Sequence, residues 1–177
     1  LGDVYKRQEQ RPANNPNRCF NWFQAEDTAR GSGEVASIRA MIAATVAAHS
    51  VDPARIFVTG LSAGGAMAMA MLATYPAVFA GGAVIGGLPY GAAKGVAQAL
   101  ERMRGQGLPI ATALTAAVEG AAPTPPRWPT LSVWQGDADA TVQAANAEAI
   151  LAQWRGVHGL AAAPAGQESV AGHPHRS

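Results

Sequence analysis

Ser62 is the residue whose surroundings most clearly predict chemistry in this chain. It is the centre of Gly60-Leu61-Ser62-Ala63-Gly64, which follows an apolar run typical of a strand, 55–59, and precedes a run of small residues from Gly65 to Tyr75. A Gly-x-Ser-x-Gly turn between a strand and a helix is typical of a nucleophile elbow, in which the serine oxygen stands clear of the backbone. The free N–H groups of the first helical turn then favour a developing oxyanion. The alternative interpretation is a glycine-rich turn that contains an incidental serine.

The same turn requires an unusual backbone conformation. Because the chain changes from strand to helix within about one residue, we expect a cramped conformation at Ser62. Gly60 and Gly64, two residues to either side, have no Cβ atom and would let the strand and the helix approach each other.

A serine hydroxyl is a weak nucleophile at neutral pH and needs a base, usually histidine, that a carboxylate orients. Asp137 and Asp139 follow the strand expected over 131–134, which is where an α/β-hydrolase carries its acid. Aspartate also favours turns and helix N-caps, so a purely structural role is the alternative for both residues.

Four histidines are candidates for the base: His49, His158, His173 and His175. His49 precedes Ser62, which is the wrong order for this fold, and a histidine near the end of a helix is the simpler interpretation. His158 follows the helix expected over 143–154 almost directly and leaves no room for a last strand. The remaining two flank Pro174 and would suit a base or a metal pair, but nothing near them supplies further ligands.

The elements that must position these residues alternate between helices and strands. Apolar residues recur at helical spacing from Gly33 to about His49, and Asp52-Pro53 predicts a turn before the strand at 55–59. Beyond the helix that ends near Tyr75 we expect a strand at 83–85, a helix over 94–104, a loose proline-rich stretch over 105–129, a strand at 131–134 and a helix over 143–154; the tail from 156 to 177 gives no clear element. This alternation predicts an α/β layered fold with a mostly parallel sheet.

Composition sets further limits. The chain has 177 residues, which fits one domain, and its 14% of charged residues with a formal charge of +1 predict no nucleic-acid partner. The single cysteine, Cys19, allows no disulfide within these residues. Ala63 to Gly87 carries no charge, but Tyr75-Pro76 and Gly81-Gly82 interrupt it, so we expect a buried helix and a buried strand rather than a membrane span.

Several stretches together resemble the polyhydroxybutyrate depolymerase-like esterases, an α/β-hydrolase family that includes feruloyl and acetylxylan esterases. The resemblance covers residues 9 to about 158. It is carried by Glu9-Gln10, Asn14, Cys19-Phe20-Asn21-Trp22-Phe23, the run from Val51 to Gly65, Tyr75-Pro76-Ala77-Val78-Phe79-Ala80, Gly87-Leu88-Pro89-Tyr90-Gly91 and the Gly136-x-x-Asp139-x-x-Val142 turn. Family members usually carry histidine where this chain has Gln135, a difference that we expect to affect loop packing more than chemistry.

The resemblance implies a three-layer α/β/α sandwich of the α/β-hydrolase type, incomplete at both ends. It implies that Ser62 is the nucleophile, that Asp139 rather than Asp137 is the acid, and that the Ala63 N–H is one oxyanion donor. The implied substrates are carboxylic esters, polymeric or small, with neither a cofactor nor a metal. The implied location is secreted or periplasmic, and the oligomeric state is open.

The resemblance also predicts that this chain is a fragment. Residues 1–8 break the likeness abruptly, as a cloning scar would, and no strand and loop before Glu9 could supply the second oxyanion donor. The family's base sits in a loop after a further strand, so we expect the catalytic histidine to lie beyond Ser177 and the 177 residues alone to be inactive. Residues 9–177 would then be a partial catalytic domain, with 88–129 as a cap or a surface excursion.

Two other functions stay open on the sequence. A non-catalytic interaction protein would share the fold, and a peptidase would share the serine and the acid but cleave amides. The aromatic residues Phe20, Trp22 and Phe23 would either line an acyl groove or pack in the core.

Overall fold

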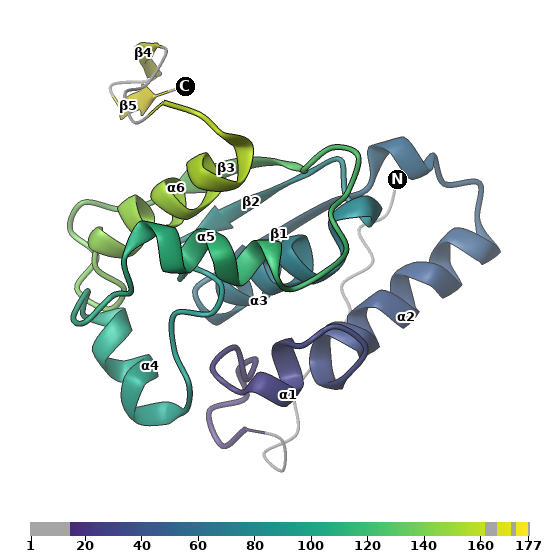
Figure 1. Ribbon diagram of the computed structural model, residues 1–177, viewed down its shortest axis with the longest axis horizontal. Coiled ribbons are helices and arrows are strands. Elements are labelled where there is room, and N and C mark those ends of the chain that lie inside the picture. The colour runs from purple at the N-terminus through teal and green to yellow at the C-terminus, as the bar shows by residue number, and fades with distance from the viewer. Residues whose placement is uncertain (1–14, 162–165, 171–172, 177) are drawn as a thin grey trace.

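The computed structural model describes residues 15–161, 166–170 and 173–176 (Figure 1). The helical elements are α1 (Ala25–Thr28), α2 (Gly33–Ala48), η1 (Pro53–Arg55), α3 (Ala63–Thr74), η2 (Pro76–Val78), α4 (Val96–Met103), α5 (Ala111–Glu119) and α6 (Ala145–His158). The strands are β1 (Phe57–Leu61), β2 (Gly81–Ile85), β3 (Thr130–Trp134), β4 (Gln167–Val170) and β5 (His173–Arg176).

The first three strands form a parallel sheet in the order β1-β2-β3, which confirms the expected α/β fold. Leu61 pairs with Ile85, and Ile85 pairs with Trp134, so the three strands end level with one another. The segments that follow the strands therefore leave the sheet at one common edge, where α/β proteins place their ligands.

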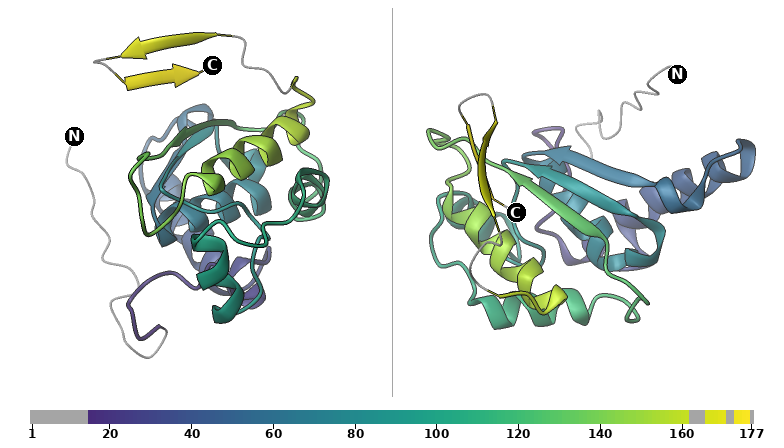
Figure 2. Two further views of the ribbon diagram at one scale, coloured as in Figure 1. Left: turned by 90° about the vertical axis from the view of Figure 1, so that its left-hand side faces the viewer. Right: turned by 90° about the horizontal axis from the view of Figure 1, so that it is seen from above.

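Helices cover one face of this sheet. α3 contacts β1 and β2, and α6 contacts β3, while α5 packs against α6; the view from above in Figure 2 shows these helices on one side of the strands. On the other face Phe57 and Leu61 are 64% and 68% exposed, and Trp134 is 55% exposed. Because strand residues alternate between faces, this pattern gives β1 and β3 one helix-covered and one open side among the described residues.

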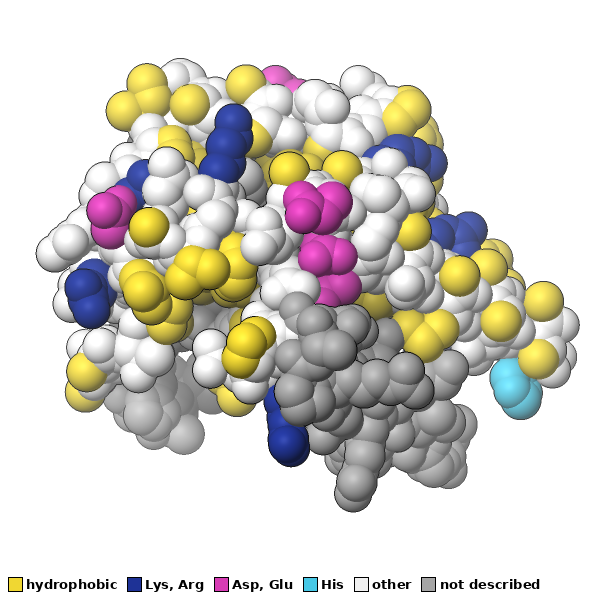
Figure 3. Space-filling view, turned by 90° about the horizontal axis from the view of Figure 1, so that it is seen from below, with side chains coloured by type: hydrophobic (Ala, Val, Ile, Leu, Met, Phe, Trp, Pro, Cys, Tyr) yellow, Lys and Arg dark blue, Asp and Glu magenta, His cyan; other side chains and the backbone are white. Residues whose placement is uncertain are grey.

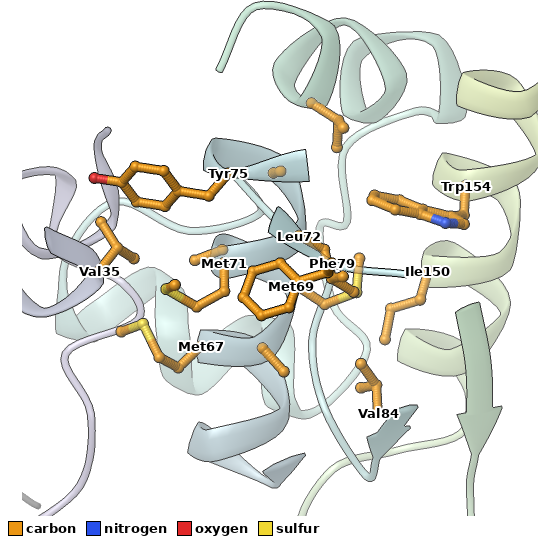
Figure 4. Close-up of a cluster of buried hydrophobic side chains, with 14 of the residues drawn as sticks. Val35, Met67, Met69, Met71, Leu72, Tyr75, Phe79, Val84, Ile150 and Trp154 are labelled. Atoms are coloured by element: carbon orange, nitrogen blue, oxygen red, sulfur yellow. The ribbon is translucent and has the colours of Figure 1, made fainter. Parts of the chain in front are cut away.

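The core is built around α3, whose residues from Gly65 to Thr74 are all buried. Its methionines point to two sides: Met67 and Met71 lie on the side of Val35 of α2, and Met69 lies beside Phe79 toward Ile150 of α6, as Figure 4 shows. An uncharged helix can be buried on all sides, which explains the charge-free run from 63 to 87. In the ranges that the structure describes, no helix combines the length and the apolar character needed to cross a membrane.

The surface is sparsely charged. Lysine and arginine side chains are dispersed over the face shown in Figure 3 and do not gather into one stripe. Hydrophobic side chains are exposed as well, among them Val96 and Leu100 of α4, at 58% and 50% of their surface.

Three sequence-based assignments were wrong. Residues 105–129 were expected to be loose, yet α5 forms within them and buries Leu114 and Val118, because the prolines at 123, 125, 126 and 129 all follow the helix rather than interrupt it. α6 extends to His158 instead of ending at 154 and closes with Gly159 in the left-handed conformation, φ 65°. The tail forms an antiparallel hairpin of β4 and β5, which no period-2 apolar pattern announced.

Candidate active site

Ser62 occupies the junction between β1 and α3. It is the only residue between Leu61, which ends the strand, and Ala63, which begins the helix, and its backbone has φ 55° and ψ −122°. Among the described residues only Arg18 shares a positive φ without being glycine. An L-residue in this region is strained by about 1–3 kcal/mol and persists only where the surrounding structure enforces it. The cramped turn expected at this serine is therefore present.

Two glycines make room for the turn, and one of them is not the glycine expected. A Cβ atom on Gly60 would overlap the Gly64 carbonyl group and lie 2.7 Å from the Gly65 nitrogen. A Cβ atom on Gly65 would lie 3.1 Å from the Gly60 oxygen and from Gly87 Cα, whereas one on Gly64 would meet nothing within 4 Å. Gly60 and Gly65, rather than Gly60 and Gly64, allow strand and helix to touch.

Backbone hydrogen bonds fix the position of Ser62 from the neighbouring strand. Its N–H donates to the Ile85 oxygen at 2.9 Å, and its own carbonyl oxygen accepts from the Ala66 N–H at 3.0 Å. The Ser62 side chain does not cap its helix and is partly exposed. The hydroxyl is therefore attached to a fixed backbone and is not used to cap the helix that follows it.

The Ala63 N–H begins α3 directly after this serine. The first N–H groups of a helix have no partner within it and carry partial positive charge, so they suit a negatively charged oxygen. The Ala63 N–H therefore belongs to the first turn of α3, and its role as an oxyanion donor stays a prediction.

Asp139 lies in the segment that follows β3. Its Oδ1 accepts hydrogen bonds from the backbone N–H groups of Thr141, at 2.8 Å, and Val142, at 2.9 Å, and its Oδ2 accepts from Gln135 Nε2 at 3.3 Å. The Val142 and Thr141 N–H groups lower the pKa of Asp139 below its ordinary value of 3.8, and Gln135 lowers it further. Asp139 is therefore held in its ionised form, whereas Asp137 is exposed in the same turn.

Ser62 and Asp139 lie at the same edge of the sheet, with the end of β2 between them. Ser62 is bonded to Ile85, and the next residue, Gly86, donates from its N–H to the Trp134 oxygen at 2.9 Å. A Cβ atom on Gly86 would lie 3.4 Å from Asp139 Oδ2. The carboxylate thus faces the strand that adjoins the serine turn, as a serine and its acid would require.

His158 lies at the opposite edge of the sheet from these two residues. Its Nε2 atom is 3.1 Å from the oxygen of Pro129, which immediately precedes β3, and its ring packs edge-on against Trp154. β3 spans five residues, which amounts to roughly 13 Å at 3.3 Å per residue. His158 therefore cannot be the base of this site.

His49 lies at the end of a helix, which was the simpler interpretation of its position in the sequence. It is the exposed C-cap residue of α2, a helix that points away from the sheet in Figures 1 and 2. His173 and His175 belong to β5, but their side chains lie outside what the structure describes.

The aromatic cluster packs against the body of the protein. Phe20 contacts the main core, and Trp22 packs against a smaller cluster of Ala66, Leu88 and Val142. Trp22 and Phe23 meet edge to face, with ring centroids 5.6 Å apart. In the described ranges no group of three or more histidine, cysteine, aspartate or glutamate residues could hold a metal ion.

Gln135 is the site residue that sequence reasoning undervalued. It was expected to affect loop packing more than chemistry, yet its side chain bonds directly to Asp139. Its position immediately before the Gly136-x-x-Asp139 turn was the available signal, since a long amide side chain there can reach back across the turn.

Comparison with known proteins identifies the family of this chain. Residues 2–173 match the family described as esterase PHB depolymerase. The chain belongs to that family. The resemblance seen in the sequence is therefore confirmed.

Three relatives show the range of the family. Poly(3-hydroxyalkanoate) depolymerase C of Paucimonas lemoignei is 38% identical over 195 residues, covering 99% of this chain and 44% of its own length. Feruloyl esterase B of Talaromyces stipitatus is 31% identical, covering 81% of this chain and 43% of its own length. Acetylxylan esterase A of Emericella nidulans is 32% identical, covering 77% and 47%. The chain spans less than half the length of these relatives.

A solved structure supports the fold. The acetyl xylan esterase from Aspergillus awamori superimposes with a TM-score of 0.79 at 24% identity, covering 85% of this chain and 58% of that chain. The parallel sheet and its helices thus correspond to an α/β-hydrolase fold.

Proposed function

We propose that this chain carries the nucleophile and the acid of a serine-dependent carboxylic ester hydrolase. Ser62 is the nucleophile, Asp139 is the acid, and the Ala63 N–H is one donor of the oxyanion hole. The observation that carries the proposal is the strained Ser62, with φ 55°, at the sheet edge where Gly86 separates it from an ionised Asp139.

The reaction would follow the acyl-enzyme route. Ser62 Oγ attacks the ester carbonyl carbon while a histidine takes the hydroxyl proton, and the carbonyl oxygen becomes an oxyanion beside the Ala63 N–H. The carbon–oxygen bond to the alcohol then breaks, and the histidine returns the proton to the departing oxygen. A water molecule, activated by the same histidine, hydrolyses the acyl-serine and restores the free hydroxyl.

Asp139 would accept a hydrogen bond from the far nitrogen of that histidine. An ionised carboxylate holds the imidazole in the correct tautomer and stabilises its protonated form without itself taking the proton. The lowered pKa of Asp139 keeps the carboxylate charged throughout the neutral range, because the Thr141 and Val142 N–H groups bind the ionised form.

The proposal assigns the base to a histidine outside these 177 residues. His158 lies at the far edge of the sheet and His49 at the exposed end of α2, so neither can reach both Ser62 and Asp139. The substrates that we propose are esters of the kinds named by the relatives, namely polyhydroxyalkanoate, feruloyl or acetyl esters.

Paired variants in the protein that contains the whole catalytic domain test this function. Ser62→Ala is compared with Ser37→Ala, whose exposed hydroxyl donates to the Gly33 oxygen on α2, and Asp139→Asn with Asp137→Asn in the same turn. With p-nitrophenyl butyrate we expect kcat to fall at least about 10³-fold in the first member of each pair and less than about twofold in the second. Equal loss within a pair would refute the assignment, and a matching anilide substrate separates an esterase from a peptidase.

A further inference from the structure

The side chain of Gln135 lies across the turn that carries Asp139. From the end of β3 its Nε2 atom reaches the Val142 oxygen at 2.8 Å, Asp139 Oδ2 at 3.3 Å and the Gly136 oxygen at 3.3 Å. Gln135 is half-buried, so water competes only partly for these contacts.

The orientation of this amide is fixed by its partners. A backbone carbonyl oxygen such as that of Val142 only accepts hydrogen bonds, so the nitrogen and not the oxygen of the Gln135 amide must face it. The NH₂ group has two hydrogens, and with one directed to Val142 the other is directed to the oxygens of Asp139 and Gly136. Gln135 therefore acts as a donor toward the carboxylate.

We infer that Gln135 is a positioning residue for the catalytic acid, holding Asp139 Oδ2 while the backbone of the turn holds Oδ1. A carboxylate offers about four acceptor sites. The N–H groups of Thr141 and Val142 occupy the two sites on Oδ1, and Gln135 occupies one on Oδ2. With the partners found in the described part of the chain, one site on Oδ2 is left, and the histidine would approach Asp139 from that direction.

Gly86, which follows the neighbouring strand β2, lies next to the same carboxylate oxygen. Its φ of 51° suits glycine, and a Cβ atom there would lie 3.4 Å from Asp139 Oδ2. The carboxylate is thus held by donors within its own turn and bordered by the residue that follows β2. A side chain that filled the volume of Gln135 without donating would keep the packing but lose the hold on Oδ2.

This inference rests on the proposed function, but its test does not depend on activity. The Asp139 carboxyl carbon is followed by NMR during an acid titration of the 177-residue chain, in the native sequence and in Gln135→Met, Gln135→Glu and Gln98→Ala. Methionine keeps the length without a donor, and glutamate replaces the donor by a negative charge. Gln98 is an exposed residue of α4 whose side chain accepts from the Lys94 N–H and does not contact the site.

We expect the titration midpoint of Asp139 to move upward in Gln135→Met, further upward in Gln135→Glu, and not at all in Gln98→Ala. A midpoint in Gln135→Met equal to that of the native chain, with the Thr141 and Val142 amide signals unchanged, would overturn the inference and leave the serine mechanism untouched.

A second measurement uses only the native chain, so it can be made even if neither Gln135 variant folds. In the native chain the side-chain amide protons of Gln135 should shift with the same midpoint as the Asp139 carboxyl carbon. Gln135 amide signals that stay constant while Asp139 titrates would overturn the inference.

Discussion

The Ser62 N–H donates a 2.9 Å hydrogen bond to the carbonyl oxygen of Ile85, the last residue of β2. This bond connects the turn after β1 to β2. Gly86, the residue that follows β2, donates from its own N–H to the oxygen of Trp134 in β3. The strained serine is consequently held by the sheet and not by its own loop. A residue in this conformation would otherwise relax, since the strain amounts to about 1–3 kcal/mol.

The glycines around Ser62 give a matched pair of stability predictions. Gly60→Ala should destabilise the fold by at least about 2 kcal/mol, because its methyl group would overlap the rigid Gly64 backbone. Gly64→Ala meets open space on a helix and should be neutral or stabilise by up to about 1 kcal/mol. Urea unfolding of both variants measures the difference. Equal costs would show that the strand and helix do not meet as described.

The lowered pKa of Asp139 predicts a pH dependence of stability. The Thr141, Val142 and Gln135 donors bind the ionised form, so the folded pKa lies below the unfolded value, and the resulting stabilisation is complete above the unfolded pKa. It should disappear as the pH falls through the folded pKa, below 3.8. The native chain and Asp139→Asn should therefore differ less in their free energy of unfolding at acidic pH than at neutral pH. Urea unfolding at several pH values measures this stability gap.

The effect of salt on this stability gap shows whether hydrogen bonds or distant charges stabilise the ionised Asp139. Hydrogen bonds within one turn are screened little, whereas ion pairs at the surface weaken at about 0.5 M salt. We expect the gap and its pH range to be nearly the same at low and high salt. A gap that vanishes in salt would mean that charges elsewhere, and not these donors, act on Asp139.

Gln153 of α6 should be essential for the segment that follows β2. It is fully buried, its Oε1 accepts from the Tyr90 N–H at 3.1 Å, and its Nε2 donates to the oxygens of Tyr90 and Leu114. Gln153→Met would remove three hydrogen bonds to backbone groups, one buried and two part-buried, and should cost about 3 kcal/mol. Gln98→Met on the exposed face of α4 is the control and should stay within about 0.5 kcal/mol of the native chain. Thermal or urea unfolding tests both, and similar stabilities would contradict the role of Gln153.

The 177 residues by themselves should show negligible turnover of p-nitrophenyl butyrate. Without a base the serine hydroxyl is a poor nucleophile, and loss of one triad member costs several orders of magnitude in rate. Turnover that disappears in Ser62→Ala would mean that a histidine within these residues completes the site.

Much of the site could be predicted because its signals are local. The turn at Ser62 depends on glycines and on a strand and helix that lie next to each other in sequence, and the place of Asp139 follows from its position after a strand. The choice of Gly64 as the second packing glycine was wrong because the approach of α3 to β2 is a tertiary contact. That contact involves Gly65 and Gly87, which sequence spacing does not reveal.

The parts that could not be predicted depend on long-range packing. α5 has little helical patterning of its own and is stabilised where Leu114 and Val118 meet α6 and the core. The hairpin of β4 and β5 consists of short polar strands that lack the alternation of apolar and polar residues from which strands are predicted. The hydrogen bonds of Gln135 depend on the fold of a turn in which several donors converge.

The most direct test of the account is to identify the residue that becomes acylated. The protein that contains the whole catalytic domain is treated with a fluorophosphonate and digested, and the modified peptide is sequenced by mass spectrometry. The account predicts a single adduct on Ser62 that is absent in Ser62→Ala and present in Ser37→Ala. Ester hydrolysis by a protein whose adduct lies on another residue, or that forms none, would contradict it.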